Sequence, residues 1–166
     1  MAAYQTTYTE RPAKGLPGQV ANEEKSNRIS RTVEDAAGIK FGTPVQRGTG
    51  DHGVAALASG TFLGIAILNP AVPPSTTNPD AYPQYFTGAF MTEGQMYVTA
   101  GGNVSDGGEV FYNTSTGRYV GASGANIVGP IPDAVFDTSG GNGDIVEISL
   151  RLRATIHPEA DAGGGD

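Results

Sequence analysis

Short strand-like runs separated by turn clusters rich in Gly, Asn and Pro fill the sequence from Gly38 onward. The runs recur at roughly the 8–12 residue spacing that is typical of β-sandwiches and barrels. The seven Tyr and six Phe residues lie in short clusters, which favours strands over long amphipathic helices. We therefore predict an all-β domain, an antiparallel sandwich or barrel.

About nine strands are predicted on this pattern, at residues 39–47, 54–58, 62–68, 85–91, 95–99, 109–113, 118–121, 134–137 and 145–154. The last run is the clearest, because its apolar and polar residues alternate, so that one face should be core. The apolar face of that run holds Val146, Ile148, Leu150 and Leu152. Residues 69–84 carry five prolines, which predicts a loop between strands.

Three regions are predicted: an extended N-terminal arm at 1–36, the β-domain at 37–157 and an acidic, glycine-rich tail at 158–166. The arm shows no periodic apolar face, but it holds scattered apolar anchors and several cations. We expect it to be ordered on other chains rather than on its own domain. The predicted contact residues are Tyr4, Tyr8, Arg11, Leu16, Val20, Arg28, Ile29 and Arg31.

The net charge and the lack of cysteine argue against several classes of function. A net charge of −7 argues against direct nucleic-acid binding, which needs a basic patch. The absence of cysteine excludes disulfides and thiolate metal sites. The longest apolar stretch, at 62–68, is far shorter than the ~20 residues of a membrane helix, and the first residues do not resemble a secretion signal, so we expect a soluble product made in the cytoplasm.

Two loops could in principle carry chemistry, but each has a simpler structural interpretation. Asp51 and His52 could orient a base for Ser59 or Thr61, yet no nucleophile elbow is present, which favours a turn. Residues 137–144 offer oxygen ligands of the kind calcium uses, but the calcium-binding repeat occurs once and out of register, which favours a hairpin loop. We predict no catalytic residues, no cofactor and no metal.

The aromatic clusters at 82–86 and 111–112 could form a sugar-binding platform. Large rings spaced in this way along strands are more typical of core. A module that binds host glycans through these aromatics therefore stays the alternative to a structural role.

Several segments in a fixed order resemble one known family. The residues that carry the resemblance are Gly15-Leu16-Pro17-Gly18-Gln19-Val20-Ala21, Ile39 to Gly48, Phe62 to Ala66, Tyr85 to Gly88 with Gly94 to Val98, and Gly107 to Tyr112 with Thr116 to Tyr119. Over about residues 15 to 152 the chain is similar to the structural cement proteins of tailed bacteriophages.

The resemblance implies a jelly-roll-like β-sandwich or barrel with an N-terminal arm. It also implies a decoration protein that binds the outer surface of a phage capsid between capsomers and stabilises the shell. Its implied partners are the major capsid protein and further copies of itself, as trimers or dimers with the homotrimer favoured, and neither nucleic acid nor a membrane. It implies a location on the virion and no catalytic residues.

Overall fold

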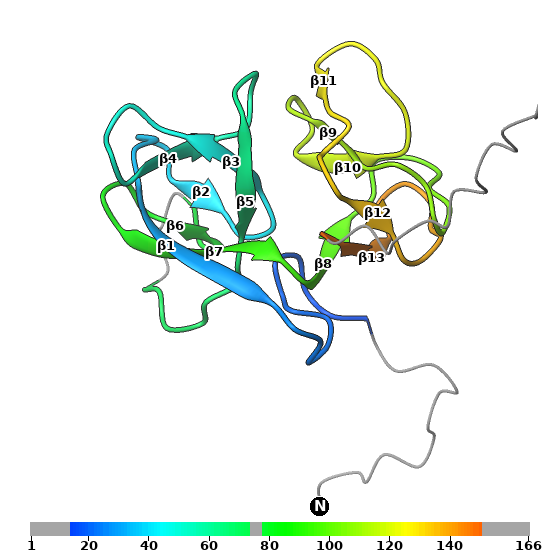
Figure 1. The fold of residues 1–166 in the computed structure, drawn as a ribbon, viewed down its shortest axis with the longest axis horizontal. Helices are drawn as coiled ribbons and strands as arrows, with labels where there is room; N and C mark the ends of the chain where they lie inside the picture. The colour runs from blue at the N-terminus through cyan, green and yellow to red at the C-terminus, as the bar shows by residue number, and fades with distance from the viewer. Residues whose placement is uncertain (1–13, 74–77, 151–166) are drawn as a thin grey trace, which may run out of the picture.

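The computed structural model describes residues 14–73 and 78–150 of the 166-residue chain, and in these ranges it contains thirteen strands and no helix. The all-β prediction is confirmed. Figure 1 shows the strands in two halves, with β1 to β7 on one side and β8 to β13 on the other. Within the described ranges no helical segment has the length and apolar character that a membrane crossing would require.

The first half is a closed barrel with the strand order β1-β4-β3-β5-β7. Its strands are β1 (Asn27–Val33), β3 (Pro44–Arg47), β4 (Gly53–Ala56), β5 (Phe62–Ala66) and β7 (Thr87–Glu93). A two-stranded sheet of β2 (Ile39–Lys40) and β6 (Ala81–Tyr82) accompanies it. The barrel form of the prediction is therefore confirmed.

The pairing between named strands is antiparallel except between β1 and β4, where Thr32 lies opposite Gly53 and Val33 opposite Val54 in a parallel ladder. The other ladders between named strands follow the antiparallel pairing predicted from the sequence, and this one departs from it. Parallel neighbours need a crossover connection. Here β2 and β3 lie between β1 and β4 in the chain and provide it.

The second half consists of two three-stranded sheets, with the orders β12-β13-β8 and β10-β9-β11. Their strands are β8 (Gln95–Thr99), β9 (Phe111–Asn113), β10 (Arg118–Val120), β11 (Ile127–Val128), β12 (Val135–Phe136) and β13 (Ile145–Ser149). The chain passes from barrel to second half between β7 and β8, at Gly94, whose φ is 133°. A side chain is rarely accommodated at such an angle, so glycine is suited to this connection.

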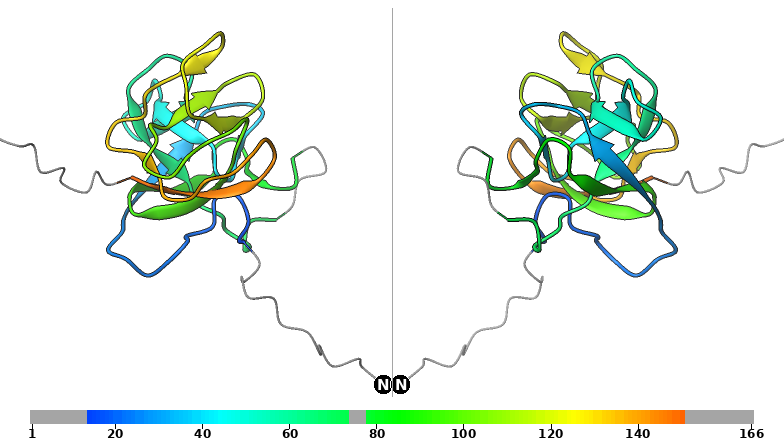
Figure 2. Two further views of the ribbon diagram at one scale, coloured as in Figure 1. Left: turned by 90° about the vertical axis from the view of Figure 1, so that its right-hand side faces the viewer. Right: turned by 90° about the vertical axis from the view of Figure 1, so that its left-hand side faces the viewer.

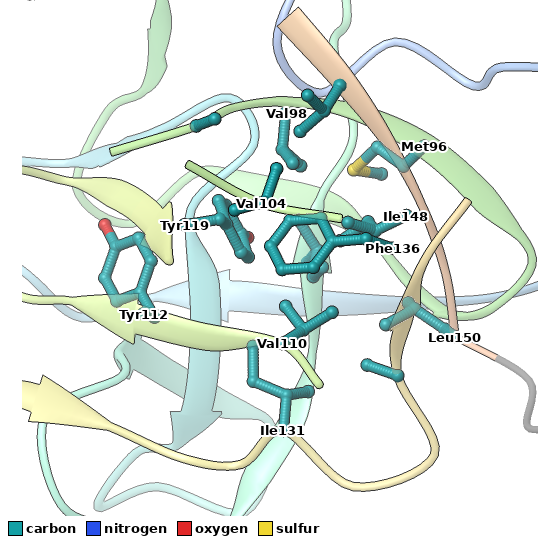
Figure 3. Close-up of a cluster of buried hydrophobic side chains, with 14 of the residues drawn as sticks. Met96, Val98, Val104, Val110, Tyr112, Tyr119, Ile131, Phe136, Ile148 and Leu150 are labelled. Atoms are coloured by element: carbon teal, nitrogen blue, oxygen red, sulfur yellow. The ribbon is translucent and has the colours of Figure 1, made fainter. Parts of the chain in front are cut away.

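Each half has its own hydrophobic core. The barrel core surrounds Tyr82 and Phe90, and the larger core spans the second half and reaches Ile65 and Met91 on the barrel. Figure 3 shows Val110, just before β9, converging with Phe136 of β12 and Ile148 of β13 in the larger core. The prediction for the last strand is confirmed at Val146, Ile148 and Leu150, all buried, while Leu152 lies outside the described residues.

The structure corrects the predicted regions at the end of the arm. Residues 27–33 form β1, which pairs with β7 along most of its length, so the arm prediction for 1–36 is wrong for these residues. This strand is rich in charged and polar side chains, so the sequence shows no apolar pattern that would reveal it. Backbone hydrogen bonds can hold a barrel strand without such a pattern. β6 within 69–84 and β11 were also missed. The tail predicted at 158–166 lies outside the described residues.

Candidate interaction surface

A short N-terminal segment, residues 17–21, joins the two halves, and we call it the strap. Gly18 N donates to Tyr97 O at 2.8 Å, Tyr97 N donates to Gln19 O at 2.9 Å, and Ala21 N donates to Gln95 O at 3.0 Å, so the strap extends the sheet beside β8. On its other side, Leu68 N donates to Gly18 O at 2.7 Å, just beyond the barrel strand β5. In Figure 2 this dark blue segment lies at the same end of the molecule as β8 and β13.

Two glycines allow the strap to approach the barrel so closely. Gly18 has a φ of 82°, and a Cβ there would lie 2.6 Å from Gly42 N and 3.0 Å from Ala66 O. Gly42 has a φ of 79°, and a Cβ there would lie 3.0 Å from Gly18 N. Both positions require glycine for conformation and for space. Backbone hydrogen bonds therefore connect the strap to both halves.

The predicted contact residues that the structure describes differ in burial. Leu16, next to the strap, is 61% exposed, whereas Val20 within it is half-buried, bridges to Met96 and packs on the larger core. Ile29 packs on the barrel core from β1. The contribution of Val20 and Ile29 to the protein's own packing makes them poor candidates for contacts with another chain.

The cations among the predicted contacts differ in exposure. Arg28 is exposed on β1, while Arg31 is half-buried and donates from Nη1 to Ser30 O at 2.9 Å. Leu16 and Arg28 therefore remain available at the surface, together with Lys14. Tyr4, Tyr8 and Arg11 lie outside the described residues.

A pocket of about 340 Å³ lies between the halves, beside the strap. Its lining includes Leu16, Lys40, Asp80, Tyr112 and Tyr119. The Tyr119 hydroxyl donates to Gly42 O at 2.7 Å, and burial raises the pKa of both tyrosines above its ordinary value. Both phenols therefore stay protonated at neutral pH, and that of Tyr119 donates the hydrogen bond that joins the two halves. Sequence reasoning missed this pocket because its lining comes from widely separated segments.

The turn at 48–53 is held by Glu34, which follows β1. The Glu34 carboxylate accepts hydrogen bonds from Thr49 N at 2.7 Å and Gly50 N at 2.8 Å, and these bonds lower its pKa below the usual value. A side chain at Gly53 would collide with the carboxylate, which explains that glycine. Asp51 and His52 are exposed on this turn, so the turn prediction is confirmed.

The loop at 137–144 connects β12 and β13, which pair antiparallel, so the hairpin prediction is confirmed. Within the loop Gly141 N donates to the Asp144 carboxylate at 2.8 Å, and Gly143 has a φ of 89°. No group of three His, Asp or Glu residues in the described ranges is arranged to hold a metal ion.

The predicted aromatic clusters are core with one exception. Tyr82, Phe111 and Tyr112 are buried, and the Phe86 ring stacks on that of Tyr82 with centroids 5.5 Å apart. Tyr85 is 76% exposed. No sequence signal distinguishes it from Tyr82, because the difference depends on the path of the backbone between β6 and β7.

Comparisons with known proteins agree with this architecture. A chain in the structure of the capsid of Myoviridae phage XM1 is 18% identical, with a TM-score of 0.66, and the match covers 90% of this chain and 98% of that chain. A chain of the head fiber gp8.5 N base of bacteriophage phi29 is 11% identical, with a TM-score of 0.46, and covers 80% of this chain and 100% of that chain. At such identities the likeness to the phage XM1 chain is one of fold alone.

The family comparison covers nearly the whole sequence. No curated protein matches the chain. The family model described as structural cement protein (E217 gp24/Pam3 gp6) matches residues 4–151, which include the strap, the barrel and the second half. The chain therefore belongs to the phage structural cement protein family and is a capsid cement protein that associates with the shell.

Proposed function

We propose that this protein binds the outer surface of a phage capsid between capsomers and stabilises the assembled shell without catalysing a reaction. The observation that carries the proposal is the strap. An arm that docks on neighbouring chains reinforces a shell only if its root is held firmly, and here the root is bonded to both halves of the domain. Repetition of such contacts around the shell adds avidity.

The arm supplies the proposed contacts. Residues 1–26 precede β1 and include Tyr4, Tyr8, Arg11, Lys14 and Leu16. The cations suit acidic groups on the shell, and such exposed ion pairs weaken as salt rises, because the Debye length is only ~10 Å at 0.1 M. The partners are the major capsid protein and further copies of this chain as a homotrimer. The net charge of −7 disfavours direct nucleic-acid contact.

Shells that lack the protein provide the test. Purified protein is added to them at saturation, and shell disruption is followed by calorimetry at low and high salt. A ligand that binds the assembled shell and not its separated subunits stabilises the shell by about 2.7 kcal/mol per site at a concentration of 100 times Kd. We expect a higher disruption temperature with the protein bound.

A variant that lacks residues 1–13 is the matched control, because the strap and every described strand stay in place. This variant should fold normally but bind the shell more weakly, and because it loses Arg11 while Lys14 remains, its salt dependence should become smaller without disappearing. An unchanged disruption temperature with the full-length protein bound at saturation would refute the cement function. Light scattering of the free protein tests the homotrimer against the dimer.

A further inference from the structure

Tyr85 combines an exposed aromatic side chain with a rarely adopted backbone conformation. Its φ is 64°, in the left-handed region that side chains other than those of Gly, Asn and Asp adopt infrequently. The ring is 76% exposed, so burial in its own domain does not explain why a large residue stands there. The residue lies in the short connection between β6 and β7 (Figure 1).

Hydrogen bonds fix the backbone on both sides of Tyr85. Tyr85 N donates to Val33 O at 2.8 Å, and Val33 N donates to Phe86 O at 3.0 Å, so the connection is held against the end of β1. Gln84 Nε2 donates to Glu34 O at 3.0 Å. The backbone that carries the exposed ring is therefore held in place before any partner binds.

The other described residues with positive φ point to a special role for Tyr85. Eight of them are glycines, and the remaining two are Asn126 and Asp133, whose short polar side chains tolerate this conformation. Tyr85 is the large residue of this set. An unfavourable conformation that the surrounding structure enforces is found most often at functional sites. The exposed side chain of Tyr85 contributes little to folding, although its backbone conformation is unfavourable. This combination suggests that the tyrosine is retained for binding.

We propose that Tyr85 is an anchor that inserts into an uncharged pocket on a protein subunit of the shell, with its phenol donating a hydrogen bond there. This inference rests on the proposed cement function and adds a second contact to that of the arm. Rigid, exposed tyrosines are frequent energetic centres of protein interfaces, because they bring a large apolar area at a low cost in conformational entropy.

A protein pocket fits the surroundings of the ring better than a glycan does. Two hydrogen-bonding side chains near it are already engaged, Gln84 with Glu34 O and the Glu34 carboxylate, just after β1, with the turn at 48–50. A sugar site needs several polar side chains that converge on the ligand. The exposed residues of the connection are Pro83 and Tyr85, neither of them charged, and Tyr85 adds a hydroxyl.

The experiment compares wild-type protein with Tyr85→Asn for folding and for binding to shells that lack the protein. Asn tolerates positive φ, so the thermal unfolding midpoint of the variant should equal or exceed that of the wild type. Its Kd for the shell should rise about tenfold or more, as is usual on loss of an interface anchor. Tyr85→Phe, which keeps the ring, should lose less affinity for the shell. Asp133→Asn, an exposed residue at a similar φ of 57°, should change neither property.

The outcomes separate this inference from the proposed function. If the wild type does not bind shells, the cement function itself fails. If the wild type binds and Tyr85→Asn binds equally well, the anchor is refuted and the cement function stands. Binding of the wild type to a glycan array that Tyr85→Asn abolishes, with shell binding unchanged, would assign the ring to a sugar instead.

Discussion

Replacing Gly18 by Ala would place a methyl group against the backbone of the barrel. The new Cβ would lie 2.6 Å from Gly42 N, and the φ of 82° would be held by a residue that disfavours it. The left-handed conformation costs about 1–2 kcal/mol, and overpacking adds about 1–3 kcal/mol. Four backbone hydrogen bonds hold the strap. These bonds contribute about 0.5–1.5 kcal/mol each. Their sum limits the loss of stability, because the strap can detach from the domain instead of bearing a larger strain.

We therefore expect Gly18→Ala to lower the free energy of unfolding by about 2–4 kcal/mol in urea titrations. Amide exchange should quicken first at Leu68 and Tyr97, whose N–H groups bond to the strap. Gly107→Ala is the matched control, because Gly107 has a φ of 77° and a Cβ there would meet nothing within 4 Å. Losses equal to within about 0.5 kcal/mol would refute the argument that close approach to the barrel requires Gly18.

Two further predictions concern stability. Ile148→Ala should lower the free energy of unfolding by about 2–5 kcal/mol in urea titrations, because Ile148 is fully buried in the larger core, and a loss below about 0.5 kcal/mol would contradict this. Glu34 has a folded pKa below its ordinary value of 4.5, so its stabilising contribution is present above that pH and disappears as the pH falls through the folded pKa. Glu34→Gln should therefore weaken the acid dependence of stability, and an unchanged pH profile of the thermal midpoint would argue against this role.

The all-β class and the turns could be predicted from the sequence because they depend on local patterns. Val146, Ile148 and Leu150 alternate with polar residues, and a strand places alternate residues on one face wherever it lies. The glycine-rich loop at 137–144 also indicated a hairpin through local conformational preference. These features need no knowledge of which strands become neighbours.

The tertiary structure decided the membership of β1 and the exposure of Tyr85. Asn27–Val33 reads as part of a polar arm, yet pairing with β4 and β7 makes it a barrel strand. Tyr82 and Tyr85 are three residues apart and chemically identical, but Tyr82 is buried, while the turn held against Val33 directs Tyr85 outward. The reason is physical: backbone hydrogen bonds form between any residues that the topology brings together, so side-chain patterns do not reveal which distant segments will pair.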